Sequence, residues 1–235
     1  TLYAKWNVLT YVPRFDWDGN VPLRDWLLKS GGKLLTAEYD KTNGVYINAN
    51  YHGIPYIDVT VEYDQVFTLP TEIPGAKYFG YYQVETGEYG SYEVFHQVTD
   101  SALTKMAAEQ GAVVKIGAEW KAEVNGDGAR LIYNASQFEN LVVRGPSSES
   151  LIRCALDADL DLCNINMTPN DGLPGNTIFD GNNHTIYHVK RGETIAKYAG
   201  GTIYGYGDNV TVKDLTIDGM TVDYTAAVEI SRNEY

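Results

Sequence analysis

The sequence of 235 residues lacks the features that mark several large classes of protein. It has two cysteines, too few for a disulfide-rich scaffold or for a zinc site made of cysteines alone. No apolar run approaches the roughly 18 residues of a membrane-spanning helix, so we expect no direct membrane contact. Basic residues number 18 against 31 acidic ones, and the net charge of −13 makes nucleic acid an unfavourable partner.

Apolar and aromatic residues are plentiful, which argues against a disordered chain. Hydrophobic residues make up 44% of the sequence, and 19 residues are tyrosine. Tyrosine, threonine, valine and isoleucine favour strands, and the 23 glycines favour the turns between them. The sequence therefore predicts a mainly β protein, and its length suggests two domains.

A connecting segment with one short helix is predicted over residues 7–43. In VPLRDWLLKSGGK, Pro22 suits the first turn of a helix, and apolar residues recur at helical spacing from Leu23 to Leu27. The glycine pair that begins at Gly31 ends the pattern. We expect this helix to pack on a strand-rich domain.

Residues 44–122 have the pattern of a small domain of strands. Apolar residues stand at every second position from Ile57 to Tyr63, which predicts a half-buried strand. The segment SALTKMAAEQ, from Ser101 to Gln110, contains good helix formers after a serine and predicts a helix. Strands around one helix predict a small α+β unit.

Two motifs in this domain resemble a known repeat. VTVEYDQVFTLPTEIPGAKYFGYYQVETGEYG, which begins at Val59, and IGAEWKA, which begins at Ile116, resemble the internalin-type B repeat, also called the Listeria/Bacteroides repeat. Tyr81 stands where that family usually has tryptophan, and residues 97–110 look inserted. The resemblance implies a divergent β-grasp-like module of a bacterial surface protein. Because the opening TLYAKW is similar to the end of the family's repeat, residues 1–6 are predicted to close a preceding repeat.

A change of pattern follows residue 122. Two turn dipeptides, Asn125-Gly126 and Asp127-Gly128, predict a hinge over residues 123–130. Beyond it, SLIRCALDADLDL, NTIFDGNNHTIYHVK and NVTVKDLTIDGMTVDY are short alternating segments about 20 to 35 residues apart, a spacing typical of repeat proteins. This spacing predicts the coils of a solenoid, each burying its apolar side against its neighbours.

The same region resembles the right-handed parallel β-helix of bacterial surface proteins that carry FDGNGHTI and GLUG-like repeats. FDGNNHTI, from Phe179 to Ile186, differs from that motif only at Asn183. The resemblance covers residues 131–235 and implies the first coils of a β-helix. We expect further coils beyond them and further modules of the same chain on both sides.

Acidic and histidine residues in this region raise the possibility of a metal site. Asp157, Asp159 and Asp161 alternate with apolar residues and are expected to share a solvent-facing strand face, which could lend two of the six to eight oxygens that calcium takes. A plain solvated face explains them as well. His184 and His188 would lie about 13 Å apart on a strand, too far to share a metal, so we expect a turn-stabilising His184 and a surface His188. We predict no cofactor and no metal site, with the three aspartates as the weak calcium candidate.

The two cysteines, Cys154 and Cys163, are nine positions apart across ALDADLDL. On one continuous strand they would face opposite sides, so a bridge between them needs an intervening turn. Two buried thiols are the simpler interpretation, and a disulfide would suit an exported protein. The sequence leaves both open.

Tyrosines are the candidate ligand-binding residues. Tyr78 and Tyr82 in the first domain, and Tyr204 and Tyr206 in the second, could form amphipathic contact surfaces for a glycan or a protein. Packing in a strand-rich fold is the alternative role for each of them. Phe79 and Tyr81 are expected in the core of the repeat.

No residue is assigned a catalytic role. The sequence has no G-x-S-x-G motif, and a lyase acting on acidic sugars would need a cationic groove, whereas the second domain has more carboxylates than cations. We expect a non-catalytic, extracellular segment of a bacterial cell-surface protein that adheres to, or displays a binding face for, a glycan or a host or neighbour-cell surface protein. The alternatives are the substrate-binding or solenoid part of an extracellular polysaccharide-degrading enzyme, and a structural stalk without a ligand.

Overall fold

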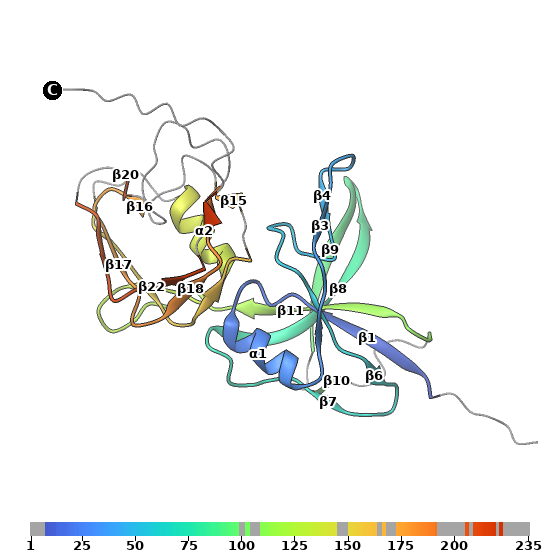
Figure 1. Cartoon of the computed structure of the whole chain (residues 1–235). Helices are drawn as coiled ribbons and strands as arrows, with labels where there is room; N and C mark the ends of the chain where they lie inside the picture. Colours follow the sequence, from blue (N-terminus) through green and yellow to red (C-terminus); the bar gives the residue numbers. More distant parts are fainter. Residues whose placement is uncertain are drawn as a thin grey trace, which may run out of the picture. The chain divides into compact units, whose positions relative to one another are not determined.

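The computed structural model describes residues 8–98, 102–103, 109–144, 150–163, 166–167, 173–191, 205–206, 209–219 and 221–222. The chain forms two compact units (Figure 1). Unit 1 comprises Thr1–Trp17, Pro22–Tyr51 and Pro55–Lys121, and unit 2 comprises Asp18–Val21, His52–Ile54 and Ala122–Tyr235. The mainly β character predicted from the sequence is confirmed, with a mixed sheet in unit 1 and parallel sheets in unit 2.

Unit 1 is built on a seven-stranded sheet in the order β2-β5-β1-β11-β8-β9, with β6 also paired to β1. The strands are β1 (Thr10–Phe15), β2 (Lys33–Leu34), β5 (Ile57–Asp58), β6 (Val61–Glu62), β8 (Ala76–Gly87), β9 (Gly90–Gln97) and β11 (Val113–Trp120). β1 runs parallel to β11, and the other pairs are antiparallel. Two further pairs complete the unit: β3 (Glu38–Asp40) with β4 (Val45–Ile47), and β7 (Phe67–Thr68) with β10 (Ala102–Leu103).

The core of unit 1 lies on one face of this sheet. Phe15, Phe79 and Ile116 are buried there, because alternate residues of a strand share a face. The strand phase predicted from Ile57 onward is confirmed, since Ile57, Val59 and Val61 are buried while the residues between them are more exposed. Residues 59 and 60 separate β5 from β6 within that segment.

Helix α1, Val21–Lys29, confirms the helix predicted in the first part of the chain. Leu23 and Leu27 lie one turn apart and are fully buried. The chain leaves the helix through Gly31, whose φ of 86° favours glycine, and the Gly32 amide donates to the Leu27 carbonyl at 2.9 Å.

The helix predicted from Ser101 to Gln110 is wrong at the positions that the structure describes. Ala102 and Leu103 form β10 and pair with Thr68 and Phe67 of β7. Pairing with a neighbouring strand therefore outweighs the helix propensity of these residues. Residues 104–108 lie outside the described part of the chain.

The predicted connecting segment, residues 7–43, and the predicted repeat, residues 44–122, both contribute to unit 1. β1 comes from the former and pairs with β5 and β11 of the latter. Because β1 is an interior strand, the sheet requires both segments. Residues 1–6, predicted to close a preceding repeat, lie outside the described residues.

The described strands of unit 2 form four sheets, and their pairs are all parallel. The first is β12 (Arg130–Ile132), β13 (Ile152–Leu156), β17 (Thr177–Asp180) and β21 (Thr211–Lys213). The second is β14 (Leu160–Asp161), β18 (Thr185–Tyr187) and β22 (Thr216–Asp218). The others are β15 (Asn166–Met167), β19 (Lys190–Arg191) and β23 (Thr221–Val222), and β16 (Leu173–Pro174) with β20 (Gly205–Tyr206).

The core of unit 2 is formed by apolar residues at equivalent positions of successive parallel strands. Leu160 pairs with Ile186, and both are fully buried. Cys154 pairs with the buried Phe179, whose ring lies 5.9 Å from that of Phe138. Strands form in each of the three segments predicted after residue 131, and Ile186 is buried as predicted, whereas the row from Asp157 to Asp161 does not keep its predicted phase.

Helix α2, Ala135–Arg144, packs Phe138 into this core and was not predicted from the sequence. Its start is capped in a way similar to a capping box: the Gln137 amide donates to Oδ1 of the N-cap residue Asn134, and Gln137 Oε1 accepts from the amide of the preceding residue, Tyr133, each at 2.8 Å. Neither helix in the described part of the chain is long and apolar enough to cross a membrane.

The segment Asp18–Val21 completes unit 2, although it comes from the N-terminal part of the chain. The Ala135 amide donates to the Asp18 carbonyl and the Asp161 amide donates to the Gly19 carbonyl, both at 2.8 Å. The Asn20 side-chain amide donates to the Tyr133 carbonyl at 2.9 Å. These bonds satisfy buried polar groups that would otherwise destabilise the unit.

The predicted hinge, residues 123–130, forms a hydrogen-bonded hairpin in unit 2. Val124 and Arg130 are bridge partners across it. Asn125 Oδ1 accepts hydrogen bonds from the Asp127 amide at 3.0 Å and the Ala129 amide at 2.9 Å, which is the turn chemistry expected of asparagine.

Candidate functional site

Tyr78 and Tyr82, two of the predicted ligand-binding residues, lie on the outer face of the sheet of unit 1. Phe79, which follows Tyr78 on β8, is buried in the core, as predicted. Because successive residues of a strand point to opposite faces, Tyr78 and Tyr82 point away from the core. Phe95 of β9 is the direct strand partner of Tyr82, and their rings meet edge to face at 5.3 Å. The rings of Tyr78 and Phe95 are 6.0 Å apart.

Two glycines make room for these rings. Gly80 of β8 is paired with Gly117 of β11. A Cβ at Gly80 would lie 2.5 Å from the Phe95 ring, and a Cβ at Gly117 would lie 2.7 Å from the Tyr82 ring. The rings of Tyr82 and Phe95 therefore rest against bare backbone, where any larger residue would displace them.

Lys115 brings a positive charge to the same face. Its Nζ lies 5.0 Å from the centre of the Tyr82 ring, 5.7 Å from that of the Tyr56 ring and 3.0 Å from Glu93 Oε2. Burial works against the charge, but the hydrogen bond to Glu93 and the nearby negative groups outweigh it and raise the pKa of Lys115. Burial raises the pKa of Tyr56. We call Tyr56, Tyr78, Tyr82, Phe95 and Lys115 the aromatic face.

Polar groups border the aromatic face. A hydrogen bond to Glu119, together with partial burial, raises the pKa of Tyr78. Lys77 Nζ lies 5.3 Å from the centre of the Tyr78 ring and 4.0 Å from Glu119 Oε2. Rings for stacking, bordered by donors and acceptors, suit the binding of an amphipathic ligand.

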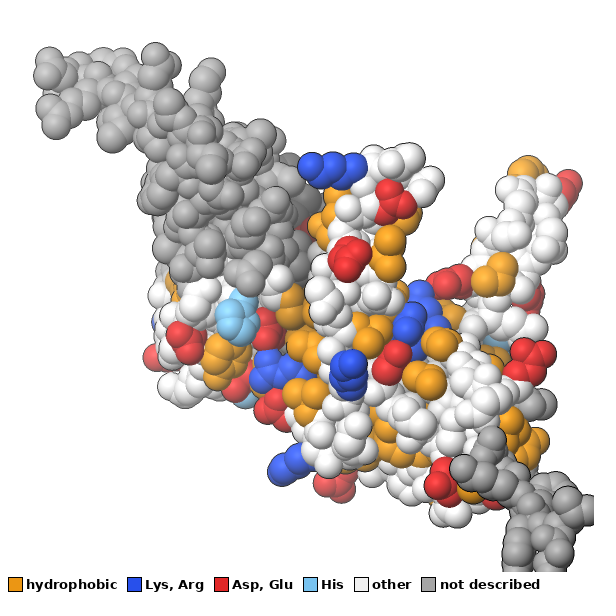
Figure 2. Space-filling view, turned by 45° about the vertical axis from the view of Figure 1, so that its right-hand side comes forward, with side chains coloured by type: hydrophobic (Ala, Val, Ile, Leu, Met, Phe, Trp, Pro, Cys, Tyr) orange, Lys and Arg blue, Asp and Glu red, His pale blue; other side chains and the backbone are white. Residues whose placement is uncertain are grey.

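Acidic and basic side chains are mixed on the face of the molecule shown in Figure 2. Figure 2 shows hydrophobic side chains interleaved with single basic and acidic ones on the face that it presents. On that face the described residues form no broad area of one charge sign. Such a surface suits an uncharged polar partner better than a polyanion.

The structure brings together only two of the four predicted tyrosines. Tyr204 lies outside the described residues, and Tyr206 belongs to β20, which pairs with β16 in unit 2. Sequence reasoning missed Tyr56, Phe95 and Lys115. The turn between β8 and β9 was a signal for Phe95, because a hairpin register pairs it with Tyr82, whereas Tyr56 and Lys115 reach the face through long-range pairing.

The prediction that Asp157, Asp159 and Asp161 share one solvent-facing strand face is wrong. β13 ends at Leu156 and β14 begins at Leu160, so the row is interrupted. Asp161 is buried, with 5% of its surface exposed, and its carboxylate accepts a hydrogen bond from the Cys163 amide at 2.9 Å. Within the described residues, no three histidine, cysteine or acidic side chains are grouped as metal ligands would be.

Each of the two histidines in the FDGNNHTIYH segment pairs with one of these aspartates. His184 Nδ1 lies 3.0 Å from Asp159 Oδ1, and His188 Nδ1 lies 2.9 Å from Asp161 Oδ1. His188 is exposed, as expected, but it also covers a buried carboxylate. Both contacts link the chain around β14 with the chain around β18 and serve the structure of unit 2.

The two cysteines are not bridged. The bend after β13 separates them, so they do not lie on one continuous strand. Burial raises the pKa of the Cys154 thiol, against a smaller opposing effect of Arg130. A thiol with a raised pKa is a poor nucleophile at neutral pH.

Comparisons of the chain with protein-family models, curated proteins and solved structures found no match. The function of the chain is therefore inferred from the residues and geometry described above.

Proposed function

We propose that the chain is a non-catalytic binding segment of a bacterial cell-surface protein and that the aromatic face holds a glycan or protein ligand outside the cell. One observation carries this proposal: Tyr78, Tyr82 and Phe95 gather on the outer face of a sheet whose other face is the core. These rings also cover the bare backbone of Gly80 and Gly117, and large aromatic residues on an outer sheet face supply much of the binding energy at contact surfaces.

We also propose a fold for each of the two units. A mixed sheet in which β1 runs parallel to β11, with one helix, supports a β-grasp-like module related to the B repeat. Parallel pairing of β14 with β18 and of β18 with β22, with Leu160 and Ile186 stacked in the core, supports successive coils of a parallel β-helix.

A glycan and matrix-protein array tests the proposal. The chain is probed as a monomer and as a multimer, because avidity reveals weak sites. We expect selective binding to a subset of spots. The double variant Tyr78→Ala/Tyr82→Ala should weaken it at least tenfold, about 1.4 kcal/mol.

Tyr89→Ala is the matched control. Tyr89 is 97% exposed and lies in the turn between β8 and β9, outside the aromatic face. If the double variant and Tyr89→Ala both lost binding, the loss would indicate general damage to the fold and would argue against binding at the aromatic face. If neither the monomer nor the multimer bound any spot, the proposal would be overturned and a structural stalk would be favoured. Binding accompanied by cleavage of the glycan would favour part of a polysaccharide-degrading enzyme.

A further inference from the structure

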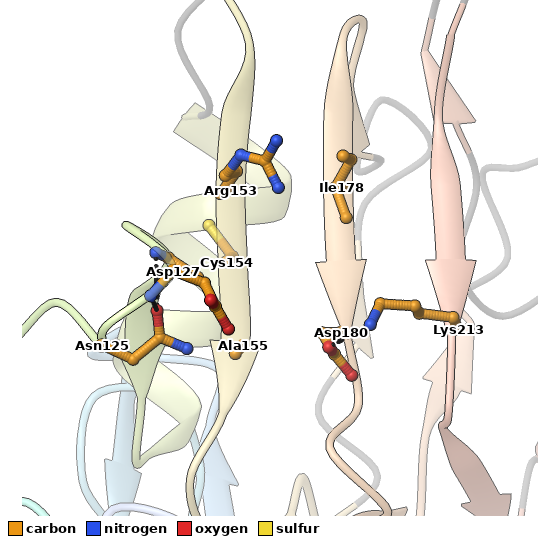
Figure 3. Close-up of a pocket in the computed structure, with 9 residues that line it drawn as sticks. Asn125, Asp127, Arg153, Cys154, Ala155, Ile178, Asp180 and Lys213 are labelled. Atoms are coloured by element: carbon orange, nitrogen blue, oxygen red, sulfur yellow. Dashed lines mark hydrogen bonds and ion pairs between the residues drawn. The ribbon is translucent and has the colours of Figure 1, made fainter.

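A pocket of about 390 Å³ lies on the outer face of the first sheet of unit 2 (Figure 3). Cys154 of β13 and Phe179 of β17 are in register and buried, so their neighbours Arg153 and Ile178, also in register, point to the opposite face. Ala155 shares that opposite face with Arg153. The pocket therefore opens on the face opposite the core, although the buried Cys154 also lines it, and it belongs to a different unit from the aromatic face.

The floor of the pocket is apolar and its sides are charged. The apolar part of the lining comes from Ala129, Cys154, Ala155 and Ile178. Asp180 pairs in register with Ala155 on one side and with Lys213 on the other. Figure 3 shows Asp180 and Lys213 joined across β17 and β21, and their charged atoms are 2.5 Å apart.

The hairpin of residues 123–131 forms the other side. Asn125 Oδ1 holds the amides of Asp127 and Ala129, so the turn that carries Asp127 is locally fixed. Figure 3 shows Asn125 and Asp127 beside β13, on the side away from Lys213. Among the described residues, neither the Asp127 carboxylate nor the Arg153 guanidinium forms an ion pair, so both remain available to a ligand.

The charges around the pocket balance. Two carboxylates, Asp127 and Asp180, face two cations, Arg153 and Lys213. The hydrogen bond from Lys213 lowers the pKa of Asp180, and the same contact raises the pKa of Lys213, so both are charged at neutral pH. The pocket therefore offers hydrogen-bond donors and acceptors without net charge.

We propose that this pocket binds one ring of a neutral, hydroxyl-rich glycan. A hydroxyl group can donate to Asp127 or Asp180 and accept from Arg153, and it brings no charge that needs compensation. An anionic sugar would find no net positive charge in the pocket and would be repelled by a chain of net charge −13. The apolar C–H side of a sugar ring fits a floor of alanine and isoleucine, and the volume lies within the usual range for small-ligand sites.

Amide chemical shifts of the whole chain, followed by NMR, test this site. The neutral probes are the methyl glycosides of glucose, galactose and mannose, and the charged probe is glucuronate. We expect at least one neutral glycoside to shift the amides of Asp127, Arg153 and Ile178 saturably, with a millimolar dissociation constant. Glucuronate should bind at least threefold more weakly.

Single, double and control variants test whether the glycoside binds in this pocket. Arg153→Ala and Asp127→Ala change polar residues on the pocket's rim, and each should weaken binding at least threefold, or tenfold together. Asp218→Ala, which removes an exposed carboxylate of β22 outside the pocket, should leave it unchanged. The spectrum of each variant shows whether its fold is retained.

Several outcomes would overturn the proposal: no saturable shift with any neutral glycoside, tighter binding of glucuronate, or binding that survives the double variant. Tyr78→Ala/Tyr82→Ala should not change these shifts, which keeps this site distinguishable from the aromatic face. Either site can fail while the other stands.

Discussion

In unit 1 one face of a mixed sheet is buried in the core and the other carries the aromatic face. In unit 2, by contrast, residues at equivalent positions of successive parallel strands stack on one another. Ile116 illustrates the first arrangement, because it is buried while its neighbour Lys115 belongs to the aromatic face. Ile186 illustrates the second, packed between Leu160 and Ile217 on adjacent strands. The outer face of unit 1 can thus vary without loss of the core, whereas each inward position of unit 2 supports two neighbouring strands.

Placing a charge in the stacked core should have the largest effect. Ile186→Asp puts a carboxylate at a fully buried position without a partner and should cost about 3 to 5 kcal/mol of unfolding free energy. Thr216→Asp, on the exposed β22, should change it by less than about 0.5 kcal/mol. Urea denaturation compares the two, and equal effects would contradict the assigned strand phase.

The same glycine substitution should cost more in unit 2 than in unit 1. A Cβ at Gly181 would lie 2.5 Å from the Asp214 carbonyl oxygen and from Leu215 Cα, which are backbone atoms, whereas at Gly117 it would meet the Tyr82 ring at 2.7 Å. Backbone yields less than a side chain, so we expect Gly181→Ala to cost about 3 kcal/mol and Gly117→Ala about 1 kcal/mol. Denaturation midpoints in the opposite order would refute the argument.

Removing each histidine of unit 2 should give unequal, smaller losses. Asp161, the partner of His188, has a side chain only 6% exposed, whereas that of Asp159, the partner of His184, is 36% exposed. His188→Ala leaves a buried carboxylate with one partner fewer and should cost about 1 kcal/mol, while His184→Ala should cost a few tenths. Thermal melts at neutral pH compare them, and equal losses would show that burial of the aspartate is unimportant.

A salt titration should separate two aspartates that have lowered pKa values for different reasons. Asp180 in unit 2 accepts a hydrogen bond from the charged Lys213, whereas Asp40 in unit 1 accepts from Asn43 and from backbone amides. Screening weakens only charge–charge attraction, so about 1 M salt should raise the pKa of Asp180 toward its ordinary value near 3.9 and change that of Asp40 little. Carboxyl ¹³C shifts report both values.

The lowered pKa values of Asp180 and Asp40 determine the direction in which the stability of the fold changes with pH. Each carboxylate is deprotonated more readily in the folded state, so its stabilising contribution is present above its ordinary pKa. That contribution is lost as the pH falls through the lower, folded-state pKa. Lys213→Gln should raise the pKa of Asp180 without affecting Asp40, and a shift of both would contradict the local cause.

Local patterns were the reliable part of the sequence prediction. Helix α1 followed from a proline start, apolar spacing and a glycine stop, and the burial of Ile186 followed from alternation. The start of α2 was also encoded, since Asn134 and Gln137 have the spacing of a capping box. A short amphipathic helix beside strong strand patterns was overlooked.

Positions governed by distant partners were the ones that prediction missed. Ala102 and Leu103 pair with β7, which overrides their helix propensity. Asp161 looks like a solvent-facing residue in an alternating row, yet a bend after Leu156 turns it inward against His188. No local pattern shows either partner.

The sequence by itself determined the mainly β character of the chain, the position of α1, the strand phase from Ile57 to Val61 and at Ile186, and the turn chemistry. These features depend on side-chain periodicity and on residues a few positions apart. Tertiary structure alone decided that β1 joins the sheet of β11, that Asp18–Val21 belongs to unit 2, and that Tyr56, Tyr82 and Lys115 meet. The physical reason is that strand pairing satisfies backbone hydrogen bonds with partners at any sequence distance, so many registers fit one local pattern and only packing of the whole unit selects among them.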